Sequence, residues 1–253
     1  MIYLLPLVLL IAVLIVIIRD YRHLHRINPT SDILFATAPD KKQLDLMIAD
    51  AYPIIILDKI DDNLTIKDLE EKIPNEIIKY TYKSKDGENT IQIKDIGKYR
   101  DDMLLLKNKN IIDKSNIRSV INQILDGFKR PLTIYPSTDI YAHIVSKDTR
   151  IPLQKNTNDT NLIIVMEGNI RVFLISPLYK DNMYENNNTT PIDIWNPDLD
   201  KYPKYSKTKI ASDTLREKEI LYIPPKWWYA IYSPDGTFII QVQRENILSQ
   251  YIK

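Results

Sequence analysis

Residues 221–231 have the sequence LYIPPKWWYAI, and this stretch decides the fold. Its first three residues favour a buried strand, which Pro224 and Pro225 must end because proline lacks an N–H group and has a fixed φ. A second strand begins at the tryptophan pair. Because side chains alternate along a strand, Tyr229 should point into the interior of a small barrel. The plainer alternative is a β-bend capped by aromatic residues, so the rest of the chain has to decide between them.

The composition is that of an ordinary globular protein. The chain has 253 residues, of which 44% are hydrophobic and 26% charged, with a formal net charge of +1. A charge so near zero gives no electrostatic footprint for nucleic acid, and we expect no such partner. The absence of cysteine excludes disulfides, thiolate catalysis and Cys-ligated zinc. With only His23, His25 and His143, a site with several histidine ligands is almost impossible to build.

An apolar run from Ile2 to Ile18 begins the chain, and three arginines follow it within eight residues. The run is at the short end of what spans a bilayer as a helix. It predicts a single-pass membrane anchor over residues 1–18 and a juxtamembrane segment over 19–50. Because the positive charges follow the run, the C-terminal domain should lie in the cytosol. The alternative is an atypical signal peptide.

Residues 51–253 are predicted to form one domain, with a helical part over 51–130 and a barrel core over 131–245. From about residue 132 onward the pattern changes to short strands separated by turns. Such a pattern is typical of an antiparallel sandwich or barrel. The predicted fold class is therefore mainly β with flanking helices packed outside the barrel.

Three stretches together resemble one family. Asn161 to Pro177 (NLIIVMEGNIRVFLISP) is similar to its strand–turn–strand motif, and Asn196 to Tyr205 (NPDLDKYPKY) to its N-P-D-x-x-x-(F/Y)-P excursion. Residues 221–231 are similar to its L-Y-I-P-x-x-W-W-H-x-V motif. This is the cupin-like, Jumonji-C-related family of iron and 2-oxoglutarate oxygenases, and the resemblance covers residues 50–245. It implies a double-stranded β-helix, a jelly-roll barrel with flanking helices.

The family binds iron with two histidines and one carboxylate. Residues 151–156 (IPLQKN) resemble its T-P-L-H-x-D motif, which puts Gln154 and Asn156 at the first two ligand positions. Counting back from the glycine turn shifts the register by one residue and gives Lys155 and Thr157 instead. Neither register contains a histidine or a carboxylate.

The third ligand position falls at Tyr229, whose phenol would have to ionise from a pKa of about 10 to bind iron well. The resemblance therefore implies a degenerate site, and we expect neither Fe(II) nor 2-oxoglutarate as a cofactor. The family's clamp for 2-oxoglutarate falls at Ile170 or Arg171, and only the arginine could hold a carboxylate. His143 could be imagined as a replacement ligand, but a lone histidine in a strand is more often a packed core residue.

The predicted function is a membrane-anchored, non-catalytic binding or scaffold protein with an unknown protein or small-molecule partner, and a homodimer is possible. Its candidate pocket residues are Asn161, Arg171 and Trp228. The alternative is an active Fe(II)/2-oxoglutarate-dependent oxygenase with an atypical metal site. A third hypothesis is a sugar or peptide binder in which Trp195, Trp227 and Trp228 stack on a ligand at the barrel mouth. For Trp227 we prefer core packing.

Overall fold

The computed structural model describes residues 4–57, 60, 64–82, 85–99, 103–115 and 117–251. Its strands are β1 Leu34–Thr37, β2 Ile54–Leu57, β3 Ile77–Tyr82, β4 Lys85–Gln92, β5 Met103–Asn108, β6 Ser137–Lys155, β7 Thr160–Glu167, β8 Asn169–Ile175, β9 Ile210–Arg216, β10 Ile220–Ile223 and β11 Trp228–Glu245. Its α-helices are α1 Leu4–His25, α2 Lys41–Ala49, α3 Ile66–Lys72, α4 Ile96–Tyr99, α5 Asn110–Lys114, α6 Arg118–Gly127 and α7 Ile247–Tyr251. Three 3₁₀ helices are η1 Ile93–Asp95, η2 Pro177–Asn182 and η3 Pro203–Lys207.

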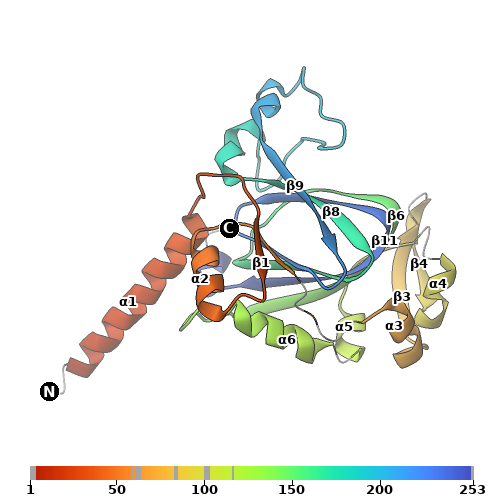
Figure 1. Cartoon of the computed structure of the whole chain (residues 1–253), viewed down its shortest axis with the longest axis horizontal. Helices are drawn as coiled ribbons and strands as arrows, with labels where there is room; N and C mark the ends of the chain where they lie inside the picture. Colours follow the sequence, from red (N-terminus) through yellow and green to blue (C-terminus); the bar gives the residue numbers. More distant parts are fainter. Residues whose placement is uncertain are drawn as a thin grey trace.

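The long strand β11 joins two facing β-layers (Figure 1). Its first part pairs with β8, and its last part pairs with β7, while β6 follows it along most of its length. One layer continues from β7 through β10 to β2 and β1, and the other continues from β8 to β9. A mainly antiparallel arrangement of this kind, with helices outside, agrees with a cupin or jelly-roll fold.

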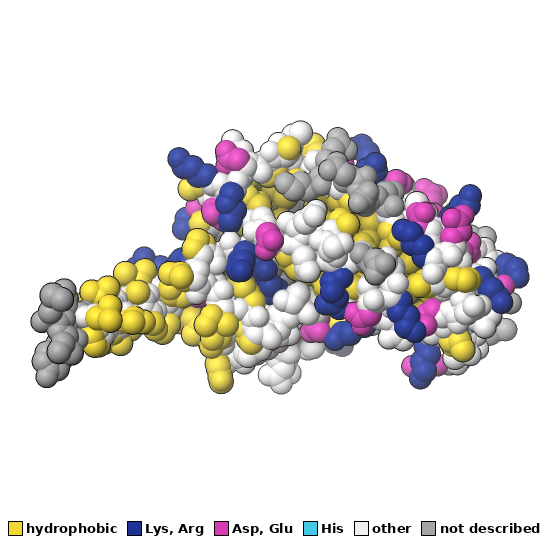
Figure 2. Space-filling view, turned by 90° about the horizontal axis from the view of Figure 1, so that it is seen from below, with side chains coloured by type: hydrophobic (Ala, Val, Ile, Leu, Met, Phe, Trp, Pro, Cys, Tyr) yellow, Lys and Arg dark blue, Asp and Glu magenta, His cyan; other side chains and the backbone are white. Residues whose placement is uncertain are grey.

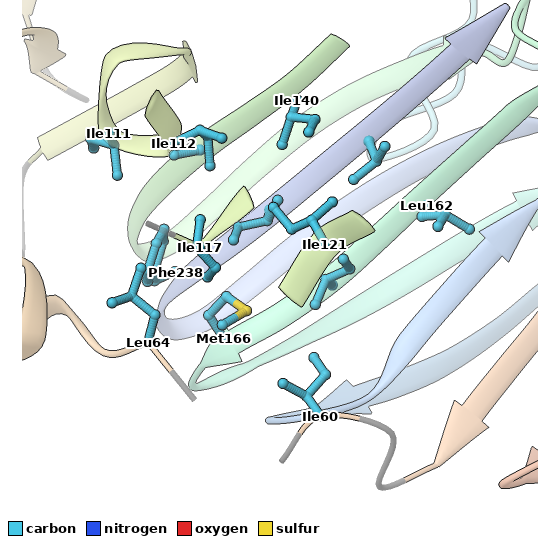
Figure 3. Close-up of a cluster of buried hydrophobic side chains, with 14 of the residues drawn as sticks. Ile60, Leu64, Ile111, Ile112, Ile117, Ile121, Ile140, Leu162, Met166 and Phe238 are labelled. Atoms are coloured by element: carbon cyan, nitrogen blue, oxygen red, sulfur yellow. The ribbon is translucent and has the colours of Figure 1, made fainter. Parts of the chain in front are cut away.

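Alternation along the strands divides the core into two parts. In β10, Leu221 and Ile223 face the barrel interior, whereas Ile220 and Tyr222 face the helices. The helix-facing side belongs to a cluster to which α6 contributes Ile121, and Figure 3 shows Ile121 together with Leu162 and Met166 of β7 in this cluster. Because both faces of β10 are covered, its sequence is apolar at every position.

The two turns predicted from proline and glycine are present. Strand β10 ends at Ile223, immediately before Pro224. The β7–β8 turn is at Gly168, with φ +83°, and a Cβ added there would lie 2.6 Å from the carbonyl oxygen of Gly236. Only glycine fits such a position without strain.

Residues 51–130 differ from the helical segment that the sequence predicted. They contain α3 to α6, but they also contribute β2, β3, β4 and β5, which extend the sheet. Strand β2 is an integral barrel strand, paired with β1 and β10. Strands β3, β4 and β5 pair with one another and with β6, so this segment belongs to the sheet as well as to the helical layer.

Helix α1 projects from the barrel (Figure 1), and Figure 2 shows hydrophobic side chains along the part that extends away from the body. No helix in the described part of the chain is long and apolar enough to cross a membrane. The spanning anchor predicted for residues 1–18 is therefore not found. Beyond Ile18 the helix continues through polar residues, and Asp20 and His23 are buried against the barrel.

Candidate functional site

Gln154 and Tyr229 meet inside the barrel. The two residues are directly opposite in the β6–β11 ladder, and the Tyr229 hydroxyl donates to Gln154 Oε1 at 3.2 Å. Gln241 on β11 donates through Nε2 both to the Tyr229 hydroxyl and to Asn161 Oδ1, each at 3.0 Å. The prediction that Tyr229 points inward is confirmed, since only 3% of its surface is exposed. Burial raises the pKa of the Tyr229 phenol, so this group is neutral at physiological pH.

Asn156 lies outside this polar network and caps a turn instead. Its Nδ2 donates to the carbonyls of Ile223 and Pro224 at 2.8 and 2.9 Å, and its Oδ1 accepts from the amide of Asn158. Its own backbone bonds to Trp227 and Lys226 across the turn. The sequence placed Asn156 beside Gln154 and Tyr229, and the structure does not. The physical reason is that β6 ends at Lys155, so the strand alternation no longer fixes the direction of the next side chain.

The alternative register, with Lys155 and Thr157, does not place both of its residues inside the barrel either. Lys155 forms an ion pair with Glu185 and donates to Asn188 Oδ1 at 3.0 Å, on the outside of the barrel. Thr157 lines a pocket in the same outer region. Neither register therefore places both of its first two ligand positions, Gln154 with Asn156 or Lys155 with Thr157, inside the barrel.

His143 lines the same interior pocket as Gln154, Tyr229 and Gln241. Only 5% of its surface is exposed, and neither ring nitrogen meets the geometry of a hydrogen bond to any described residue. Burial, and after it the charge of Lys107, lower the pKa of His143 to about 4, although the adjacent Gln241 amide offsets part of the shift. The imidazole is therefore neutral. A packed core histidine was the preferred interpretation, and the structure adds that this ring borders a polar pocket.

Gln241 was not among the residues predicted from the sequence. It is 6% exposed and connects Tyr229 to Asn161, whose Nδ2 has no hydrogen-bond partner in the described structure. The sequence does contain a feature that could have identified it, because this glutamine interrupts the apolar run FIIQV in β11. A buried polar residue needs a partner, and it therefore indicates other polar groups nearby.

Two pocket candidates lie elsewhere. Arg171 is exposed, with Nη2 3.4 Å from Ser212 Oγ and its guanidinium over the Phe173 ring. Its neighbour Ile170 takes the interior position, because successive residues of β8 face opposite sides. Trp228 is buried in a separate cluster outside the barrel interior. Of the three candidates, only Asn161 lines the interior network.

The three tryptophans do not share a surface. Trp227 is fully buried in the barrel core, as preferred from the sequence, and Trp228 is buried in the outer cluster. Trp195 packs edge-on against Phe173 with Arg150 over its ring. The structure therefore provides no joint stacking platform for a sugar or peptide.

The donors of the interior pocket do not fit ferrous iron with 2-oxoglutarate. The pocket presents one imidazole, two carboxamides, a neutral phenol and the amine of Lys107, whereas iron of this class prefers two imidazoles and a carboxylate. No group of three histidine, cysteine or acidic side chains lies together among the residues that the structure describes. The pocket has a volume of about 30 Å³, room for about two waters at ~10–15 Å³ each. That space is too small for a metal ion together with a five-carbon diacid.

Comparison with known proteins agrees with this architecture. The profile of the family described as "Cupin-like domain" matches residues 78–244. The chain is 30% identical over 109 residues to "Jumonji C domain-containing protein 5" of Drosophila melanogaster, covering 41% of this chain and 27% of that protein. It is 34% identical over 76 residues to human "tRNA wybutosine-synthesizing protein 5", covering 30% and 24% of the two chains.

A third relative is "Lysine-specific demethylase 8" of Xenopus tropicalis, 30% identical over 80 residues, which cover 30% of this chain and 18% of that protein. The chain thus spans about a quarter or less of the length of these curated relatives. The similarity covers only one part of each of these larger proteins.

Proposed function

We propose that this chain, which belongs to the cupin-like domain family related to the Jumonji C proteins, is a non-catalytic binding or scaffold member of that family. One observation carries the proposal. The interior positions where the family resemblance puts metal ligands hold Gln154 and Tyr229, which hydrogen bond to each other, and Asn156 is committed to the neighbouring turn. These groups satisfy one another and leave no open set of anionic or imidazole donors.

The polar network supports the same proposal energetically. Each buried polar group left without a partner costs about 1–3 kcal/mol, so the bonds among Gln154, Tyr229 and Gln241 stabilise the barrel. Binding a metal through Gln154 and Tyr229 would require breaking this network. The alternative, an oxygenase with an atypical site, has one observation in its favour, the unpartnered His143 in the same pocket.

Purified protein should bind Fe(II) weakly under anaerobic conditions and should not convert 2-oxoglutarate to succinate above a buffer control. The physical reason is the poor donor set and the small pocket. Metal content of the desalted protein and succinate formation are the two measurements. Stoichiometric iron that is lost on Tyr229→Phe or His143→Leu would show that the site is functional.

A gain-of-binding variant serves as the positive control. Gln154→His together with Tyr229→His would place two imidazoles beside His143 in one pocket, and this variant should bind Ni(II) or Fe(II) at least about tenfold more tightly than the wild type. Asn156 is left unchanged, because an aspartate there could not donate to the carbonyls of Ile223 and Pro224.

We also propose that α1 attaches the protein to a membrane. The support is its apolar surface: Leu5, Leu9, Val13 and Ile17 are all between 43% and 71% exposed. A helix that exposes apolar side chains along its length is unfavourable in water.

Full-length protein should therefore float with phospholipid vesicles in a density gradient, and the double variant Leu9→Glu, Val13→Glu should not. The matched control is Leu178→Glu, Leu199→Glu, which changes two exposed leucines away from α1 and should float normally. Equal flotation of all three proteins would contradict attachment through α1.

A further inference from the structure

A second pocket lies outside the barrel, where the end of α1 meets two turns. It has a volume of about 80 Å³, and its lining includes Lys155, Thr157, Asn188, Lys226 and, from α1, His25. On the volume of ~10–15 Å³ per water, it has room for roughly five to eight waters, enough for a tetrahedral oxyanion. None of these residues contributes to the Gln154–Tyr229 network.

Lys226 is held at this pocket by its backbone. It has φ +69°, which is unfavourable for a residue with a side chain, and its amide donates to the carbonyl of Asn156 at 2.7 Å. Asn156 in turn binds the carbonyls of Ile223 and Pro224 with its side chain. The turn is therefore fixed, and Lys226 is presented at a constant position.

The pocket carries more positive than negative charge. Lys226 is half-buried and has no ion-pair partner within the described ranges. Burial lowers the pKa of Lys226, and the charges of Lys155 and Lys180 lower it further, while Glu185 opposes them. Glu185 is already paired with Lys155, and the described residues that line the pocket include no acidic side chain that could pair with Lys226.

Neutral donors complete the surroundings. Asn188 accepts from Lys155 through Oδ1, which leaves its amide NH₂ available to donate. Positive charges placed close together repel one another, so each makes the charged form of its neighbours less favourable. An anion bound between them removes this cost. Lysine ammonium groups bind phosphate as point charges and suit an anion approached from several directions.

We propose that this pocket binds the phosphate group of a small molecule or of a lipid headgroup. Both sources share the tetrahedral oxyanion, and both are compatible with the position of the pocket. The lining includes Leu24 and His25 at the end of the apolar helix α1, so a headgroup phosphate could reach it while lipid chains contact the helix. A soluble phosphate ester would use the same lysines.

Two lysines with left-handed backbone conformations provide a matched pair of variants. Lys226→Gly removes the cation and suits φ +69°, and Lys218→Gly does the same at φ +70° in the exposed turn before β10. Glycine is favourable at both positions, so neither variant should unfold the protein. A difference in binding between the two variants then shows that the position of the lost lysine charge matters.

The first arm titrates full-length protein with inorganic phosphate at constant ionic strength and follows amide chemical shifts. Saturable shifts at Asn156, Thr157 and Lys226 should appear, and Lys226→Gly should weaken the affinity about tenfold, the effect of losing one hydrogen bond to a charged group. Lys218→Gly should bind as the wild type does. If the wild type shows no saturable shifts, or if both variants weaken binding equally, the pocket does not bind inorganic phosphate. The phosphate site is then overturned unless the second arm detects binding there.

The second arm distinguishes the sources with vesicles of phosphatidylcholine alone or mixed with phosphatidylglycerol, and with soluble glycerol 3-phosphate. A lipid site predicts that Lys226→Gly reduces binding to the phosphatidylglycerol vesicles alone, whereas a soluble ligand predicts an effect on glycerol 3-phosphate binding. If Lys226→Gly and Lys218→Gly behave alike with all three probes and with inorganic phosphate, the proposal is wrong. The result is independent of iron binding in the barrel.

Discussion

Replacing Asp159 with asparagine should lower the free energy of unfolding by about 3–5 kcal/mol, the cost of removing one partner from a buried ion pair. The carboxylate is 1% exposed. Its Oδ1 accepts from Arg130 Nη2 at 2.5 Å and from Asn246 Nδ2 at 2.7 Å, and His23 Nε2 lies 3.8 Å away. These three partners come from three separate segments, so Asp159 joins α1, the segment after α6 and the C-terminal region to the barrel.

The asparagine keeps the shape of the side chain but leaves Arg130 without its nearest negative charge. Arg130 is 8% exposed, and its remaining acidic neighbour, Asp20, lies 3.7 Å away. A charge buried in this way without a close partner is strongly destabilising. Because Asp20 provides partial compensation, the loss should fall nearer the lower end of the range.

Urea unfolding monitored by tryptophan fluorescence measures this loss. The control is Asp139→Asn, which removes an exposed carboxylate paired with Lys109 at 2.6 Å. An exposed pair contributes about 0–1 kcal/mol, so the control should change little. Similar losses for the two variants would mean that Asp159 has no special structural role.

The second large effect is a loss of folding stability at acidic pH. Burial, and after it the charge of Arg130, lower the pKa of His23 to about 4, and His143 has the same value. Both histidines titrate near 6.5 in the unfolded chain. Between pH 6.5 and 4 the unfolded state therefore binds more protons, and stability falls as the pH decreases through this window.

Each histidine should contribute a loss of about 3 kcal/mol by pH 4, at 1.36 kcal/mol per pKa unit, so together they account for about 6 kcal/mol. The groups facing His23 are Arg130, Asp159 and Asp20, and Lys107 faces His143. Unfolding in urea at pH 7, 6, 5 and 4.5 measures the slope. The variant His143→Leu should show about half of the decrease, and an unchanged slope in this variant would contradict a buried neutral His143.

The sequence by itself determined the barrel and its inward-facing tyrosine. Proline cannot continue a strand ladder, and glycine alone tolerates the turn at Gly168, so the order of strands and turns was fixed locally. Alternation placed Tyr229 inside. The same rule places Trp228 outside and, once Ile170 is inside, Arg171 outside, so these two pocket candidates could have been rejected from the sequence.

The tertiary structure alone decided what Asn156 does and which lysines gather around it. Asn156 follows the last residue of β6, where strand alternation ends, and its direction depends on carbonyls about 70 residues further along the chain. The approach of Lys155, at the end of β6, to Lys226, in the turn before β11, likewise depends on how these distant segments pack. Local sequence fixes the period of a strand and the position of a turn, but side chains beyond its ends are oriented by partners that only the folded chain brings near.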